Sequence, residues 1–324
     1  MLVLHSLLMK LGLVCISELL RDKSPELKFQ TMTRAQFNKK DKEESIQILS
    51  SRVAHNLRVT IETIKHCKEV GIKHYRLSCK LFPLITDPTL NLQVEHFPNH
   101  NDILYLLREI GKVAQQLEIS LSIHPDQFVV VGSNSDNVCA KSIVELNFHA
   151  WVLDMCGLPR DYTCPINIHP SLSKFNSVEG FMNKLMKNFF QCDPGVRSRL
   201  VFENEDKGFW NCANLYEYFH NYTKHMFGFA FPLTFDNLHD EANPSLDGNG
   251  KKIDMITWIM KFYHTWGVEP TFHWSEAAEG TIRNHARNLT KAPEDFGFDI
   301  TWEIEVKGKD KGFQHLLNKS LKFN

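Results

Sequence analysis

The stretch SLSIHPDQ, at residues 120–127, ends an apolar, strand-like run on His124. Later runs repeat this pattern, each delivering a His, Asp or Glu at or just beyond its C-terminal end. These runs are CPINIHPS to His169, RLVFENED to Glu203, FPLTFDNLH to Asp236 and His239, PTFHW to His273 and FDITWEIEVKGK to Glu305. Helix-length spacers separate the runs, and a (β/α)8 barrel gathers such strand ends at one mouth. The sequence therefore predicts an α/β protein with a single (β/α)8 TIM barrel and its functional side chains at the C-terminal mouth of the strands.

The chemistry of these side chains indicates bound metal. They combine imidazole nitrogens with carboxylate oxygens, and no cysteine is among them. Such a mixture suits zinc, manganese or iron at an open catalytic site better than a closed thiolate site. We therefore interpret the protein as a multi-metal hydrolase.

Each candidate ligand also has a simpler interpretation. His124 and His169 could stand at strand ends by chance, and Glu203 could be a hydrogen-bonded structural carboxylate. Burying Glu203 unpaired after the apolar run LVF would be costly, whereas bridging two metals would use both of its oxygens. The D-x-x-H spacing of Asp236 and His239 lets the two serve neighbouring metals. His273 and Glu305 add further ligands, while His285, in the polar stretch GTIRNHARN, is as easily a surface histidine.

Composition limits the alternatives. The 324 residues, 43% of them hydrophobic, can bury the core of one barrel, and the net charge of -1 gives no bulk attraction to a polyanion. Two or three divalent ions would supply that attraction locally. The eight cysteines contain no C-x-x-C pair, which favours buried free thiols in a reducing compartment. The apolar stretches of the N-terminal segment are too short to span a bilayer.

The order of elements is strand then helix throughout, with long helical patterns over residues 44–71 and 101–118, the latter capped by Asn101 or Asp102. Gly71 is the expected C-cap of the first. We divide the chain into an N-terminal leader at 1–9, a barrel domain at 10–306 and a basic tail at 307–324. Met9, at the end of the leader, is a second possible start. Lys307 and Lys309 in the basic tail could meet a phosphate.

The amino-acid sequences of several motifs resemble those of the UV damage endonuclease family. Its members are barrel nucleases related to endonuclease IV and to xylose-isomerase-like barrels. The most specific matches are H-P-D-Q-F at His124–Phe128, F-E-N at Phe202–Asn204, D-N-L-H at Asp236–His239 and E-V-K-G-K at Glu305–Lys309. The resemblance runs from Lys10 to Asp310, nearly the whole chain.

The resemblance implies a DNA repair endonuclease that cuts the phosphodiester on the 5′ side of ultraviolet photoproducts, acts also at abasic sites and other distortions, and leaves a 3′-hydroxyl. It implies two or three divalent ions, manganese first, with zinc, cobalt or magnesium as alternatives. By position, His124, His169 and Glu203 would hold one ion. Glu203, Asp236, His273 and Glu305 would hold the second, and His239 with His285 the third. Glu203, Asp236 and Glu305 would be catalytic, and Gln127 with Phe128 would form a wedge that enters the duplex at the lesion.

Some positions depart from the family pattern. A lysine that relatives carry two residues before the His273 position, and that can be carboxylated, is Thr271 here. A histidine of the early loop is matched by Asp87. A Tyr and an Asn of the first strand region are matched by Leu13 and Ser17, and Phe128 stands where a tyrosine is also found. The third ion is therefore expected to be the loosest, and the lesion preference could differ.

The expected partner is damaged double-stranded DNA, with no membrane and with the protein acting as a monomer. The expected location is intracellular: the cytoplasm of a prokaryote, or the nucleus or viral compartment of a eukaryotic host. Two alternatives remain open from the sequence. A metal-dependent sugar isomerase or epimerase on the same barrel would need fewer metals and no wedge. A non-catalytic DNA-damage binding protein would not need the intact ligand set.

Overall fold

A computed structural model describes residues 10–171, 175, 177–294 and 296–320, with side chains to residue 318. Within this part of the chain, eight parallel strands form one sheet in the order β6-β5-β4-β3-β2-β1-β10-β7. Their bounds are Lys10–Val14 for β1, His74–Leu77 for β2, Ser120–Ile123 for β3, Ile166–Ile168 for β4, Leu200–Glu203 for β5, Leu233–Thr234 for β6, Thr271–Trp274 for β7 and Thr301–Ile304 for β10. A bridge between Asp236 and His273 brings the two edge strands together, and the His273 amide donates to the Phe235 carbonyl at 2.8 Å. The predicted TIM barrel is confirmed.

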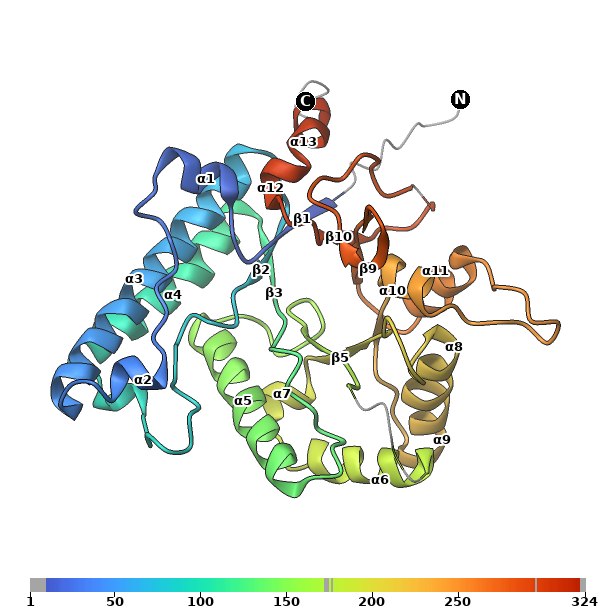
Figure 1. Ribbon diagram of the computed structural model, residues 1–324, viewed down its shortest axis with the longest axis horizontal. Coiled ribbons are helices and arrows are strands. Elements are labelled where there is room, and N and C mark those ends of the chain that lie inside the picture. The colour runs from blue at the N-terminus through green and yellow to red at the C-terminus, as the bar shows by residue number, and fades with distance from the viewer. Residues whose placement is uncertain (1–9, 172–174, 176, 295, 321–324) are drawn as a thin grey trace.

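Helices lie around the outside of this barrel (Figure 1). Their bounds are Glu18–Lys23 for α1, Arg34–Phe37 for α2, Lys42–Glu69 for α3, His100–Leu117 for α4, Asp136–Met155 for α5, Val178–Phe189 for α6, Pro194–Arg197 for α7, Cys212–Leu215 for α8, Thr223–Phe227 for α9, Asn237–Ala242 for α10 and Met255–Tyr263 for α11. A 3₁₀ turn, η1, spans Val94–His96, and a π-helix, η2, at Tyr216–Tyr222 joins α8 to α9. No helix among the described residues is long and apolar enough to cross a bilayer.

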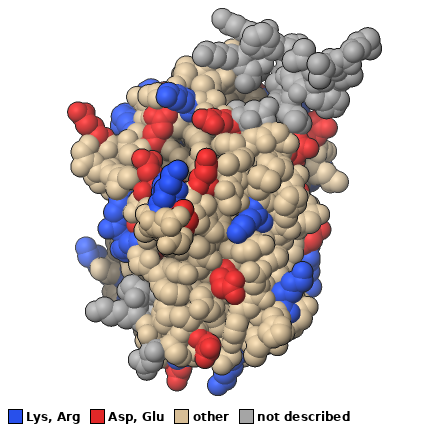
Figure 2. Space-filling view, turned by 90° about the vertical axis from the view of Figure 1, so that its right-hand side faces the viewer, with Lys and Arg blue, Asp and Glu red and all other residues tan. Residues whose placement is uncertain are grey.

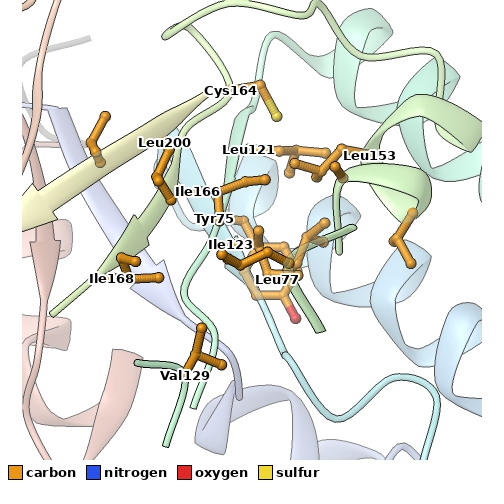
Figure 3. Packing of buried hydrophobic residues seen from close by; sticks show 14 of the residues in the cluster. Tyr75, Leu77, Leu121, Ile123, Val129, Leu153, Cys164, Ile166, Ile168 and Leu200 are labelled. Carbon is orange, nitrogen blue, oxygen red and sulfur yellow. The ribbon is translucent and has the colours of Figure 1, made fainter. Parts of the chain in front are cut away.

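Period-two alternation in the strands separates an apolar outer layer from a polar barrel interior. Tyr75 and Leu77 of β2 pack outward with Ile166 of β4 and Leu153 of α5 (Figure 3). Between them in the sequence lies Arg76, which faces the interior and contacts Glu303 on β10. Because successive side chains of a strand point to opposite faces, each strand can serve the core and the site at once.

The structure corrects the predicted start of α4. The helix begins at His100 after Asn99, not after Asn101 or Asp102. The predicted C-cap of α3 is off by one residue: the C-cap is Val70, and Gly71 follows it at φ +82°, a conformation that glycine adopts without strain.

The last part of the barrel differs from a regular strand–helix repeat. Between β7 and β10 lies a small antiparallel hairpin of β8 (Ala277–Ala278) and β9 (Thr281–His285), so His285 ends a strand and does not lie in a loop. The tail forms α12 (Lys309–Gly312) and α13 (Gln314–Ser320), and Phe313 and Leu317 join the core. All eight cysteines are free thiols, six of them buried, as predicted.

Charged side chains on one flank of the barrel are mixed in sign. Figure 2 shows this flank with its coloured basic and acidic residues interspersed. Such a surface offers no single-sign field to a polyanion.

Candidate metal centre

The C-terminal ends of the strands place the predicted ligands at one mouth of the barrel. His124 follows β3 directly, His169 follows β4, and Glu203 is the last residue of β5. Asp236 lies just after β6, where its side chain caps α10 by accepting from the His239 amide at 2.8 Å. His273 lies within β7, and Glu305 follows β10.

Glu203 lies at the centre of this arrangement, with 1% of its surface exposed. Its Oε2 is 3.2 Å from Nε2 of His124 and 3.8 Å from Nε2 of His169. Its Oε1 is 3.0 Å from Nδ1 of His273 and 3.2 Å from Nδ1 of His239. The two carboxylate oxygens therefore face two different sets of ligands, as a bridging carboxylate requires.

Unpartnered polar atoms point into the same space. Among the described residues, Oδ2 of Asp236 and Nδ1 of His273 are buried and have no hydrogen-bond partner. Nδ1 of His273 lies 3.0 Å from Oε1 of Glu203, but the two are not aligned as in a hydrogen bond. A buried polar atom that stays unpaired costs roughly 1–3 kcal/mol, so a fold that keeps several of them facing one another needs a further ligand.

A metal ion fits that requirement. Donor atoms lie within 4.8 Å of one another in one group of His124, His169 and Glu203 and in a second of Glu203, Asp236 and His273. A further group, hereafter the inner group, comprises His273, Glu303 and Glu305. Buried His, Glu and Asp side chains of this chain could thus hold metal, which confirms the coarser part of the prediction.

The pKa shifts of His169 and Glu203 favour the protonation states in which these side chains bind a metal ion. Burial disfavours a charged imidazole at His169 and lowers its pKa to about 4, although Glu203 opposes this shift. His169 is therefore neutral at pH 7, with a lone pair to offer. At Glu203, burial alone would raise the pKa, but His273 and His169 hold it well below its usual range. The carboxylate is ionised and ready to bind a cation.

His239 and His285 are in none of the three donor groups. Nδ1 of His239 is 2.8 Å from the Asn204 carbonyl, and Nε2 of His285 is 3.7 Å from Oε2 of Glu305. Burial opposes the charged form of His239, yet Asp236 and Glu203 outweigh it and raise its pKa to about 10. Thr271, two residues before His273 on β7, is buried with 8% exposure.

Three polar residues of the barrel interior were missed by the sequence analysis. Asn167 donates to Oε2 of Glu203 at 2.6 Å, and Arg76 pairs with Glu303 and Glu305. The signal that could have found them is alternation, because Asn167 and Glu303 precede His169 and Glu305 by two residues and so face the same side of their strands.

The predicted wedge lies beside the centre on the segment after β3. Phe128 is 75% exposed, and Gln127 is also exposed. Both line a cavity that His169 and His239 also line. An exposed phenyl ring next to a polar cavity is a feature of a binding surface. Lys307 is exposed, and Lys309 is half-buried near Arg76 and Glu305, where burial lowers its pKa.

Comparison with known proteins matches residues 9–324 to the family described as UV-endonuclease UvdE. The chain belongs to this family. It is 28% identical over 317 residues to a "UV DNA damage endonuclease" of Nostoc sp., covering 95% of this chain and 89% of that protein. The predicted identity as an endonuclease of UV-damaged DNA is thereby confirmed, and sugar isomerisation loses its support.

Solved structures show the same fold. "Crystal Structure of SacUVDE" superposes with a TM-score of 0.76 at 23% identity, covering 98% of this chain and 99% of that one. Endonuclease IV from Thermus thermophilus superposes with a TM-score of 0.53 at 14% identity, covering 82% of this chain and 95% of that one. The resemblance to both kinds of barrel nuclease is confirmed at the level of the fold.

Proposed function

We propose that this protein hydrolyses the phosphodiester bond on the 5′ side of ultraviolet photoproducts in double-stranded DNA and leaves a 3′-hydroxyl. Abasic sites and other distortions would be secondary substrates. The observation that carries the proposal is the convergence of His124, His169, His239 and His273 on the two oxygens of one buried glutamate, Glu203.

Two ions, manganese first, would be held there. His124, His169 and Glu203 would hold one, and Glu203, Asp236 and His273, with Glu305, would hold the other. Bound divalent ions polarise a phosphate and make water acidic enough to react near neutral pH. Zinc, cobalt or magnesium could take the same ligands.

The chain's own residues set the geometry of this centre. Glu203 would bridge the two sites, and the Asn167 amide, donating to Oε2, fixes the rotation of that carboxylate. The backbone of Asp236 is tied to Asn204, whose side chain accepts from the Asp236 amide at 2.8 Å and donates to its carbonyl at 3.0 Å. Rigid support of this kind keeps ligands in place before the substrate arrives.

Selection of damaged DNA would come from duplex deformation. Gln127 and Phe128 would enter the duplex at the lesion, replacing lost stacking while the damaged bases turn out. Extruding bases costs a few kcal/mol and costs least where stacking is already damaged. Selection would then need no readout of base sequence.

A third ion at His239 and His285 would be the weakest. Thr271 can supply no carbamate, and imidazole ligands compete with protons. Glu276 and Asp240 are carboxylates close in sequence to His273 and His239 that could replace the missing lysine. Both have partners already, because Glu276 accepts from the amides of Thr290 and Lys291 and Asp240 pairs with Lys252. Lowering the pH during metal analysis should release about one equivalent before the others. Simultaneous loss of all ions would contradict a distinct third site.

The remaining parts of the proposal concern the surroundings of the centre. Lys307 and Lys309 would contact DNA phosphates, and the protein would act as a monomer inside the cell. The barrel domain at 10–306 would contain the whole centre, followed by a basic tail at 307–324, and the leader predicted at 1–9 lies outside the described residues.

The central test is a nicking assay on an irradiated, end-labelled duplex with added manganese. Wild type should cut the irradiated duplex and leave the same duplex intact when it has not been irradiated, and Glu203→Gln should abolish cutting. The matched control is Glu269→Gln, because Glu269 is near the opposite end of the strand that carries His273 and pairs with Lys10. The control should cut at the wild-type rate.

The assay has two outcomes that would overturn the proposal. A wild-type protein that binds irradiated duplex and metal but never cuts it would be a damage-binding protein. A Glu203→Gln variant that keeps near-normal cutting and metal content would remove Glu203 from the centre.

A further inference from the structure

The inner group differs from the other two donor groups because a cation of the chain already lies in it. Nη1 of Arg76 is 2.9 Å from Oε2 of Glu303 and 2.5 Å from Oε1 of Glu305. The same nitrogen is 3.5 Å from Nε2 of His273. All members of the inner group therefore meet at one guanidinium nitrogen.

The oxygens of Glu303 are committed to neighbours within the barrel. Oε1 accepts from the Ser122 hydroxyl and lies 2.9 Å from Nε2 of His74, while Oε2 accepts from Arg76. Gly12, on the strand between β2 and β10, leaves room for this arrangement, since a Cβ there would lie 3.0 Å from the His74 ring. Glu303 is 1% exposed and is held from two sides. A carboxylate bound in this way is poorly placed to turn toward a metal ion.

Glu305 has a different environment. Arg76 occupies its Oε1, whereas Oε2 faces His285 at 3.7 Å. Nδ1 of His273 faces Glu203 and Asp236, on the opposite side of the ring from Arg76. Glu305 thus keeps Oε2 for the neighbouring site while Arg76 lies against Oε1. His273 keeps Nδ1 for that site while its Nε2 lies 3.1 Å from Oε2 of Glu303, the oxygen that Arg76 also contacts.

We propose that Arg76 is a fixed cation of this centre, occupying the inner group in place of a divalent ion and positioning Glu305 and His273 for the adjacent metal. The inference rests on the proposed metal centre. It limits the ions that the barrel interior can hold: the inner group contributes ligands to its neighbour and binds no ion of its own. A guanidinium suits this role because it stays charged at any physiological pH.

The decisive experiment counts metal in wild type and in Arg76→Met. Removing the guanidinium leaves Glu303 and Glu305 buried without their cation, so the metal-free variant should melt roughly 5–10 °C below wild type. Saturating Mn²⁺ should restore most of that loss. Equilibrium dialysis followed by elemental analysis should find about one more Mn²⁺ per chain than in wild type, because the inner group is now open.

Two further variants test the role of charge. Arg76→Lys keeps a cation in the inner group and should bind no additional Mn²⁺. Arg76→Met combined with Glu303→Met removes a positive and a negative charge together and should fold without metal, again with no additional ion. This double variant keeps the test informative even if Arg76→Met alone fails to fold.

The outcomes separate this inference from the proposed function. Equal Mn²⁺ content and equal metal-induced stabilisation in wild type and Arg76→Met would overturn the inference while leaving the centre intact. A double variant that cannot fold would overturn it too, because Arg76 would then be needed for packing and not for charge. Wild-type protein that binds no Mn²⁺ would instead refute the metal centre itself.

Discussion

Asp236, at the mouth of the barrel, and Asp310, in the C-terminal segment, are both fully buried carboxylates beside a histidine. Their partners differ. Asp310 accepts from the Ser17 hydroxyl, the amides of Glu18 and Leu19 at 2.8 and 3.3 Å, and Nε2 of His66 at 3.1 Å. Asp236 leaves Oδ2 without a partner among the described residues.

The pKa values of the two groups shift in opposite directions for this reason. Burial raises the pKa of Asp236, and His239 offsets it only in part. Burial acts in the same direction on Asp310, but the hydrogen bonds from His66 and Ser17 outweigh it and lower its pKa. A buried carboxylate whose oxygens all have hydrogen-bond partners stabilises the fold, whereas one with an unpartnered oxygen indicates a binding site for a ligand.

The largest expected effect that tests this contrast is on catalysis. Asp236→Asn preserves the cap on α10, since an asparagine oxygen also accepts from an amide. It removes a charged metal ligand, and outer-shell partners of metal ligands alone cost about 10–100-fold. Nicking of irradiated duplex should therefore fall by at least about 100-fold, with the melting temperature of the metal-free protein unchanged or raised. A clear drop in that melting temperature would mean that Asp236 is structural.

The reciprocal substitution should act on stability. Asp310→Asn weakens a buried, charge-assisted network that joins α1, α3 and α12, and should cost roughly 2–4 kcal/mol of unfolding free energy. Urea unfolding followed by circular dichroism measures this loss. Nicking activity per folded molecule should stay near that of wild type. Loss of cutting without loss of stability would remove the contrast between the two aspartates.

Strand-end position alone was enough to find His124, His169, Glu203 and Asp236 as candidates, because parallel strands bring their C-terminal ends to one mouth. It could not find Glu303. A charged residue within an apolar run gives no sign of its role unless its partners are known. The partner of Glu303, Arg76, is 227 residues away in the sequence. The hairpin that ends at His285 was also missed, because its exposed residues show no alternation of apolar and polar side chains.

A third prediction extends the contrast from polar atoms to apolar surface. Phe128 is 75% exposed, whereas Phe202, in the outer core layer, is 1% exposed. Phe128→Ala should leave stability within about 0.5 kcal/mol of wild type, as exposed substitutions do. Binding of irradiated duplex should weaken by about 1–3 kcal/mol, the usual worth of stacking one base on an aromatic ring. Fluorescence anisotropy with irradiated and intact duplexes measures it, and equal weakening on both would argue against a wedge.

The smallest expected effect is the pH dependence of the Asp310 contribution. Its folded-state pKa lies below the unfolded value, so the unfolded chain takes up the proton first as the pH falls. The stabilisation is therefore fully present above the unfolded value of about 3.9 and is lost as the pH drops through the folded value. Asp310→Asn cannot titrate at this position, so the stability difference between wild type and this variant should be constant from pH 7 to about 5 and shrink toward pH 3. Urea midpoints for the two proteins across that range provide the measurement. If the stability difference between the two proteins instead grew as the pH fell, the folded protein would take up the proton before the unfolded chain. The pKa of Asp310 would then be raised by folding, as that of Asp236 is.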